Sequence, residues 1–209
     1  MAIVKGFDTY APVTRETLCC ANSNGYGKFV GRYYTATIPG KLLKLDEAKL
    51  ISSCSFKVVS VYQDGNDSQG CFTKEWGEKD GKWAYNYAKD TIGQPSGSAI
   101  YFGVDFDPLD PVVKGGVTDY FTAVKNTFQQ LGGKYKIGVY GSGLVCSYIK
   151  DTKKLADYSW LSMSKGWQGS QNYLNGNTWD INQMSKVVIN GINCDSNDYR
   201  SEDFGGWWL

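Results

Sequence analysis

Short apolar runs and amphipathic stretches alternate along most of this chain. Runs rich in Val, Ile, Phe and Tyr predict strands at residues 3–8, 28–34, 56–62, 99–104, 136–140, 157–162, 178–183 and 189–195. Between them, apolar residues at helical spacing predict helices at residues 14–22, 45–53, 79–92, 113–131 and 144–149, and a short one at 152–156. Strands that alternate with helices are typical of parallel βαβ units.

Eight such strands predict an α/β fold, a compact (β/α)8 barrel of the TIM type, formed by residues 1–209 as a single domain. A full (β/α)8 barrel has about 250 residues, so we expect reduced helices in the last units. A loop rich in Gly and Asn replaces the helix before the seventh strand in this prediction. A flavodoxin-like open sheet is the alternative, but it would leave three of the predicted strands unused.

The apolar run Ala99–Val104 leads directly into two acidic residues, Asp105 and Asp107. An unbroken apolar run is typical of a strand buried on both faces. If the strand continues to Asp107, the two carboxylates share one face. The carboxyl ends of barrel strands are where active sites are built. The alternative is that both acids are solvated residues of a turn.

Polar residues also follow other predicted strands: Asp8, Gln63 and Asp64, Gln183, and Asp195. The first and eighth strands of a barrel are neighbours, and the fourth lies opposite them, so these acids should converge on one mouth. Crowded, partly buried carboxylates raise the pKa of at least one of them. A raised pKa is what an acid needs to stay protonated near neutral pH.

Composition narrows the chemistry. The chain has no His, which excludes Ser-His and Cys-His nucleophile pairs and His-bearing zinc sites. Its six Cys form no C-x-x-C pair, so we expect no zinc site, and we expect Cys19 and Cys20 to be thiols rather than a bridge. The net charge of +1 argues against nucleic acid as a partner, and no apolar run is long enough to span a membrane. The chain opens without a recognisable leader peptide, and the glycosylation sequon at Asn66 is weak evidence of secretion.

Several stretches, taken in order, resemble one known family; they are residues 6–8, 101–107, 138–142, 179–183, 195–197 and 203–207. This is the Rv2525c-like (DUF1906) family of glycoside-hydrolase-like domains, which is similar to the glycoside hydrolase family 25 lysozymes. The resemblance implies a barrel that hydrolyses the β-1,4 bond between N-acetylmuramic acid and N-acetylglucosamine in peptidoglycan. It implies a peptidoglycan or related glycan partner and an extracellular or cell-wall place of action. We expect no cofactor and a monomer.

The resemblance also assigns roles to residues. Asp8 and Asp195 match acids on the first and eighth strands of the family 25 enzymes. Their general acid is the Glu of a D-x-E motif after the fourth strand, and this chain has D-x-D. In one register Asp107 replaces that Glu, and in the other Asp105 replaces it while Gly103 replaces the Asp. Catalysis is therefore expected from Asp8, Asp105, Asp107 and Asp195, and sugar binding from Gln183, Gln63, Tyr62, Tyr140 and Trp160. For the three aromatic residues, packing in the core is the competing interpretation.

The exchange of Glu for Asp leaves other functions open. Asp is one methylene shorter than Glu, so the barrel could bind a cell-wall glycan without cleaving it. A third hypothesis is that the acids hold Mg²⁺ or Ca²⁺, which prefer oxygen ligands. Glycan binding without new reducing ends would indicate the second function, and a metal-dependent activity or melting shift the third.

Overall fold

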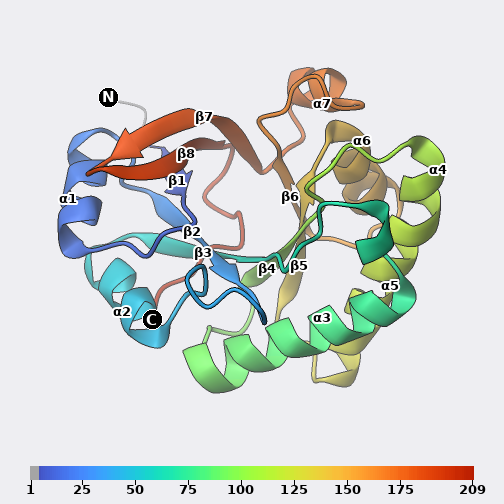
Figure 1. Ribbon diagram of the computed structural model, residues 1–209, viewed down its shortest axis with the longest axis horizontal. Helices are drawn as coiled ribbons and strands as arrows, with labels where there is room; N and C mark the ends of the chain where they lie inside the picture. The colour runs from blue at the N-terminus through green and yellow to red at the C-terminus, as the bar shows by residue number, and fades with distance from the viewer. Residues whose placement is uncertain (1–4) are drawn as a thin grey trace.

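The computed structural model describes residues 5–209 and shows a closed barrel surrounded by helices (Figure 1). The strands follow one another around the barrel in sequence order. They are β1 (Gly6–Asp8), β2 (Phe29–Tyr34), β3 (Lys57–Tyr62), β4 (Ala99–Gly103), β5 (Lys136–Gly141), β6 (Tyr158–Leu161), β7 (Ile181–Ile189) and β8 (Ile192–Tyr199). The predicted barrel is confirmed, and the open-sheet alternative is wrong.

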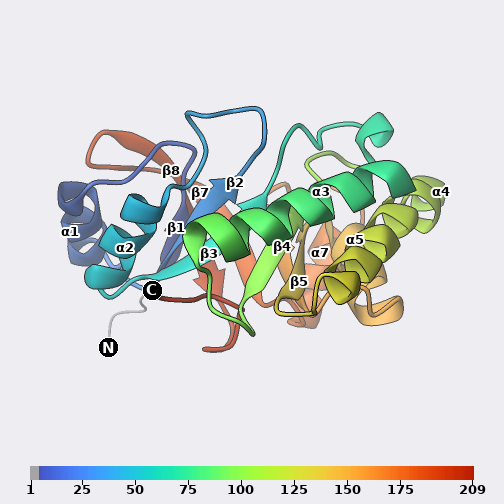
Figure 2. The ribbon, with the colours of Figure 1, turned by 90° about the horizontal axis from the view of Figure 1, so that it is seen from below.

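Helices connect most of the strands on the outside of the barrel. They are α1 (Arg15–Ser23), α2 (Leu45–Ser53), α3 (Lys74–Asn86) with its π-helical end η2 (Tyr87–Ile92), α4 (Asp110–Val112), the π-helical η3 (Val113–Val117), α5 (Thr118–Gln130), α6 (Gly143–Cys146), the π-helical η4 (Ser147–Thr152) and α7 (Ser170–Gly176), with a 3₁₀ turn η1 at Gln69–Cys71. Helices α3 and α5 lie side by side against one flank of the barrel (Figure 2). A Cβ on Gly77 would come within 2.3 Å of the Tyr120 carbonyl oxygen, so a glycine is what allows this close approach.

Local signals located most of these elements. Thr14 caps α1 as expected, because its side chain accepts a hydrogen bond from the Thr17 backbone. The helix predicted at residues 152–156 is wrong, since η4 ends at Thr152 and residues 154–156 are extended or irregular. The loop predicted before β7 contains the short helix α7, whose flanking residues Gly169 and Asn177 both have positive φ. Its Gly and Asn therefore bound a helix rather than replace one. The first two residues of the strand predicted at 3–8 lie outside the described range.

The last strand departs from the expected parallel arrangement. Strand β8 is antiparallel to both β7 and β1. The turn that reverses the chain is Asn190–Gly191, and both residues have positive φ, as a tight hairpin requires. Strand β8 therefore starts at the mouth, and Asp195 lies within it instead of at its end. Asp195 is paired directly with Asp8 on β1, so Asp195 still lies at the carboxyl end of the parallel strands.

Alternation along the strands sorts side chains between two apolar layers. One layer fills the barrel interior, and it contains Phe29, Val59, Val61, Ala99, Tyr101, Tyr158, Trp160, Ile181 and Phe204. The other lies between the barrel and its helices and includes Tyr62 and Phe102. The C-terminal segment covers the end of the barrel opposite the mouth, where the Tyr101 hydroxyl donates to the Phe204 carbonyl (2.8 Å). Within residues 5–209, no helix combines the length and apolar character needed to cross a membrane.

Candidate active site

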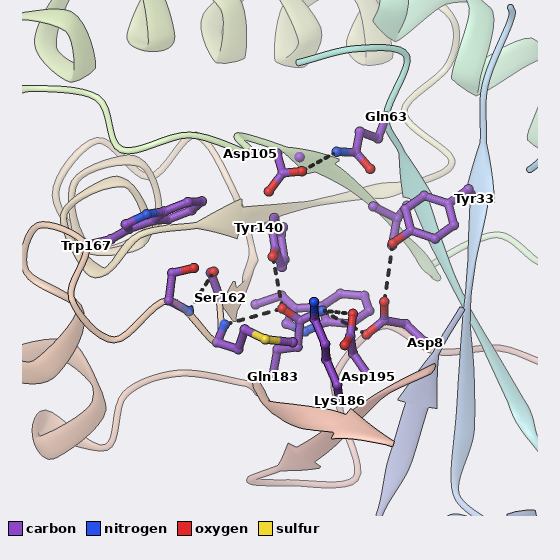
Figure 3. A pocket seen from close by; sticks show the side chains of 15 residues that line it. Asp8, Tyr33, Gln63, Asp105, Tyr140, Ser162, Trp167, Gln183, Lys186 and Asp195 are labelled. Atoms are coloured by element: carbon purple, nitrogen blue, oxygen red, sulfur yellow. Dashed lines mark hydrogen bonds between the residues drawn. The ribbon is translucent and has the colours of Figure 1, made fainter. Parts of the chain in front are cut away.

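A cavity of about 360 Å³ opens at the carboxyl end of the parallel strands (Figure 3). Its wall consists of inward-facing side chains from the barrel strands and of residues from the loops that follow them. The lining residues are Asp8, Tyr33, Val61, Gln63, Gly103, Asp105, Tyr140, Trp160, Ser162, Met163, Ser164, Trp167, Gln183, Lys186 and Asp195.

Asp8 is the buried carboxylate of this cavity, with only 2 % of its surface exposed. It accepts hydrogen bonds from the amide of Asn197 (2.7 Å), the amide of Gln183 (3.1 Å) and the hydroxyl of Tyr33 (3.3 Å). Burial raises the pKa of Asp8 to about 7, and the nearby Asp195 charge adds to this, against the opposing effect of the hydrogen bonds. Asp8 is therefore close to half-protonated at neutral pH.

Asp195 lies beside Asp8 and is half-buried. Burial raises the pKa of Asp195, and the Lys186 ammonium opposes that shift. The Gln183 amide nitrogen bridges the two carboxylates, at 3.1 Å from Asp8 and 3.3 Å from Asp195. The side-chain oxygen of Gln183 accepts a hydrogen bond from the Tyr140 hydroxyl (3.0 Å). The pair and its amide bridge form one hydrogen-bonded unit on the floor of the cavity.

Asp105 faces this unit from the opposite wall (Figure 3). Its Oδ2 accepts from the Gln63 amide nitrogen (2.9 Å), and its backbone N–H donates to the Asn66 carbonyl (2.9 Å). The Asp105 charge also raises the pKa of Asp195, as expected of carboxylates that share one cavity. The side-chain oxygen of Gln63, Oε1, in turn accepts a hydrogen bond from the Lys41 ammonium (2.7 Å).

The structure brings together seven of the nine residues proposed from the sequence, and they are Asp8, Gln63, Asp105, Tyr140, Trp160, Gln183 and Asp195. Trp160 is an interior residue that is 2 % exposed, and its indole N–H donates to Asn197 (2.8 Å). It supports the floor of the cavity more than it offers a surface to a ligand.

Asp107 and Tyr62 lie away from the cavity. Strand β4 ends at Gly103, so the expectation that Asp105 and Asp107 share a strand face is wrong. Asp107 turns to the loop before α7, where its carboxylate accepts from the Gln168 backbone (2.9 Å). Tyr62 points out of the barrel toward the helices, and its hydroxyl donates to Asp80 (2.8 Å).

Sequence reasoning missed several residues of this site: Tyr33, Lys41, Ser162, Trp167, Lys186 and Asn197. Strand periodicity could have indicated Tyr33. Phe29, Gly31 and Tyr33 alternate along β2, so all three lie on its inward face. Lys186 lies in the part of β7 beyond the predicted strand end. Lys41 and Trp167 come from loops, whose contacts are set by the tertiary fold.

Other chemistry weighed from the sequence has no geometry to support it. No set of three His, Cys, Asp or Glu residues in the described part of the chain is arranged to hold a metal ion. The six Cys are free thiols, which agrees with the expectation for Cys19 and Cys20. Asn66 of the glycosylation sequon is 2 % exposed, so its amide is not accessible to a glycosylating enzyme in the folded chain.

Known proteins resemble this chain over nearly all of its length. The protein YbfG of Bacillus subtilis (strain 168), described as uncharacterized, is 33% identical over 95% of this chain. The chain spans about three tenths (29%) of YbfG's length. The putative peptidoglycan hydrolase Rv2525c of Mycobacterium tuberculosis is 24% identical over 80% of the chain and 68% of that protein.

Solved structures show the same fold. The crystal structure of the Tat-secreted protein Rv2525c of Mycobacterium tuberculosis in complex with L-tartrate has a TM-score of 0.79, with 21% identity, over 98% of this chain and 99% of that one. A muramidase from Trichobolus zukalii has a TM-score of 0.60, with 14% identity, over 96% and 95% of the two chains.

A family model described as "Rv2525c-like, glycoside hydrolase-like domain" matches residues 20–199. This range begins within α1 and reaches the end of β8, so it contains all the carboxylates of the site except Asp8. Together with the barrel and its mouth, this match identifies the chain as a glycoside hydrolase-like domain. The chain belongs to the Rv2525c-like family.

Proposed function

We propose that this domain is a lysozyme-type glycosidase that cleaves the bond between N-acetylmuramic acid and N-acetylglucosamine in peptidoglycan. The observation that carries the proposal is the position of Asp105 across the cavity from buried Asp8 and half-buried Asp195. Glycosidic hydrolysis needs an acid on one side of the scissile bond and negative charge on the other. The names of two relatives, a putative peptidoglycan hydrolase and a muramidase, support this substrate.

Asp105 is the general acid in this proposal. Gln63 holds its Oδ2, so Oδ1 is the oxygen that faces the cavity and would meet the glycosidic oxygen. Gly103 lines the cavity and Asp107 does not, which favours the register in which Asp105 replaces the Glu of D-x-E. The proton passes from Asp105 to the glycosidic oxygen as the bond from that oxygen to the sugar C1 breaks.

Asp195 and Asp8 compensate the positive charge that develops at C1. The carbonyl oxygen of the substrate's own N-acetyl group attacks C1 and forms a cyclic intermediate, as is thought for the related lysozymes. Water then adds at C1 and reopens the ring, and its proton returns to Asp105. The Asp195 charge helps to raise the pKa of Asp8 to about 7, so Asp8 is partly protonated near neutral pH while the pair still supplies negative charge beside C1.

The site continues into a groove that suits a polymer. A second cavity of about 510 Å³ adjoins the first, and both are lined by Asp8, Tyr33, Lys186 and Asp195. Its outer part contains Tyr10, which is 56% exposed, and an exposed tyrosine ring is a suitable surface for a sugar. A glycan chain could therefore extend past the carboxylates, and such a chain is found in the cell wall. That the relative Rv2525c is Tat-secreted supports action outside the cytoplasm.

Purified peptidoglycan tests the proposal. The domain is incubated with the polymer, and new reducing ends are reduced with borohydride and identified after acid hydrolysis. A muramidase produces muramitol, whereas a glucosaminidase produces glucosaminitol. Sedimentation with the insoluble polymer measures binding in the same samples. Binding without reducing ends would overturn the proposal in favour of a glycan-binding module, for which the shorter Asp105 is the reason.

A further inference from the structure

A buried lysine lies behind the wall of the cavity that carries Asp105. Lys41 is 7% exposed and belongs to the loop between β2 and α2. Its ammonium donates to the side-chain oxygen of Gln63 (2.7 Å) and lies 4.0 Å from the centroid of the Tyr33 ring. Gln63 is hydrogen-bonded to Asp105, and Tyr33 is hydrogen-bonded to Asp8. The Lys41 ammonium therefore contacts one hydrogen-bonding partner of Asp105 and one of Asp8.

The loop of Lys41 is fastened to two strands. On the β2 side, the Leu43 backbone N–H donates to the Tyr33 carbonyl (2.8 Å). On the β3 side, Asp64 accepts from the Thr35 hydroxyl (2.5 Å) and from the backbone N–H of Thr37 (3.1 Å). Asp64 directly follows Gln63. Asp64 therefore holds the loop, and the residue before it accepts the hydrogen bond from Lys41. The position of the ammonium is therefore fixed by the fold.

The lysine determines which way the Gln63 amide points. An ammonium can only donate hydrogen bonds, so the amide oxygen must face Lys41. The amide nitrogen then faces Asp105, and its N–H is the group that Oδ2 of Asp105 accepts (2.9 Å). With the amide reversed, its nitrogen would meet the ammonium and its oxygen would meet the carboxylate, and both contacts would be repulsive.

We propose that Lys41 is a positioning residue for Asp105, because it orients the Gln63 amide that holds Oδ2 and so directs Oδ1 into the cavity. The catalytic part of this inference rests on the proposed function. The orientation of Gln63 by Lys41 does not, since it concerns only contacts within the chain.

The charge of Lys41 should be lost within an accessible pH range. Burial lowers the pKa of Lys41 to about 8, although three carboxylates oppose the shift. The groups that face it are Asp105, Asp64, Asp8, Arg32 and the Tyr33 ring. A neutral amine can accept as well as donate, so above that pH the amide of Gln63 is no longer held in one orientation.

The first experiment measures Gln63 directly and needs no enzymatic activity. Its side-chain ¹⁵N–¹H signals, assigned with Gln63→Ala, are followed from pH 6 to pH 9.5. In the unmodified chain and in the matched control Lys44→Met, which removes an exposed lysine of the same loop, the signals should shift with a midpoint near pH 8. In Lys41→Met they should differ at pH 6 and lack this transition. Signals in Lys41→Met that match the unmodified chain at pH 6, or keep the transition, overturn the proposal.

The second experiment measures hydrolysis. A misplaced acid should reduce kcat of Lys41→Met by at least about tenfold, with KM changed by less than about twofold. In the unmodified chain, kcat should decline above pH 8 as Lys41 loses its charge. Lys41→Arg keeps the charge, so it should recover part of the rate and show no such decline. Lys41→Gln replaces Lys41→Met if the latter does not fold. A folded Lys41→Met with unchanged kcat overturns the positioning role, whereas an unmodified chain without activity overturns the proposed function and leaves the result for Gln63 standing.

Discussion

The buried carboxylate of Asp8 should make the stability of this domain depend on pH in a specific way. The perturbation is Asp8→Asn, compared with the unmodified chain from pH 4 to pH 8. In the unfolded chain Asp8 ionises near its ordinary pKa of 3.8, and in the folded chain its pKa is about 7. Between these values the unfolded chain releases a proton that the folded chain keeps, so the free energy of unfolding falls as the pH rises.

The magnitude follows from the two pKa values. The pKa of Asp8 rises from 3.8 in the unfolded chain to about 7 in the folded chain. At about 1.4 kcal/mol for each pH unit, the free energy of unfolding falls by about 4 kcal/mol. Asp8 is almost fully buried, so solvent screening reduces this value little. Coupling to Asp195 divides the titration between two groups, which makes about 4 kcal/mol an upper value. The contribution of Asp8 stops changing only about one pH unit below its unfolded pKa and about one pH unit above its folded pKa.

The assay is urea unfolding followed by tryptophan fluorescence at each pH, for which the seven Trp residues provide the signal. Asn does not titrate, so the difference in unfolding free energy between the unmodified chain and Asp8→Asn isolates Asp8. The unmodified chain should lose stability relative to the variant from pH 4 upward, with a slope that falls off through pH 7 and is nearly level by pH 8. The urea dependence must stay equal in both proteins for this comparison. A difference that is flat, or that rises with pH, would refute a raised pKa at Asp8.

Two further substitutions test the placement of residues around the site. Tyr62→Phe removes one of the two phenols that donate to buried Asp80, the other being Tyr120, and should cost about 1–3 kcal/mol of unfolding free energy. Hydrolysis should be unchanged, and a lower kcat at equal stability would place Tyr62 in the site. Gly31→Ala brings a Cβ within 2.6 Å of the Asp8 Cβ and 2.7 Å of the Trp160 ring, and should cost about 1–3 kcal/mol by overpacking. The control Gly176→Ala has no atom within 4 Å of the new Cβ, so equal losses in both variants would count against this packing.

The sequence was sufficient for the barrel because its strands and helices have clear periods. It failed at the last strand, although Asn190–Gly191 is a strong hairpin signal between two short apolar runs. The expected series of parallel units hid that signal. The consequence was small, because an antiparallel β8 brings Asp195 to the same mouth.

The candidate site was predicted where side chains follow strand periodicity and missed where loops decide. The Val104 N–H still donates to the Tyr140 carbonyl of β5, but the Asp105 N–H donates to Asn66 in a loop. The chain therefore leaves the sheet between these residues, and period two no longer relates Asp105 to Asp107. Crowding predicted that at least one carboxylate would have a raised pKa, but only the burial of Asp8 and Asp195 shows which. Lys41 reaches Gln63 through a loop contact that no local pattern encodes.

The assignment of Asp105 as the general acid is tested by the release of reducing ends from peptidoglycan by Asp105→Asn and Asp107→Asn. Each substitution removes one exposed carboxylate, and the two positions are only two residues apart. Each variant is therefore the matched control for the other. Asp105→Asn should reduce the rate by about 10²-fold or more while binding to the polymer is retained, and Asp107→Asn should change it by less than about threefold. A rate lost in Asp107→Asn and kept in Asp105→Asn would contradict the assignment.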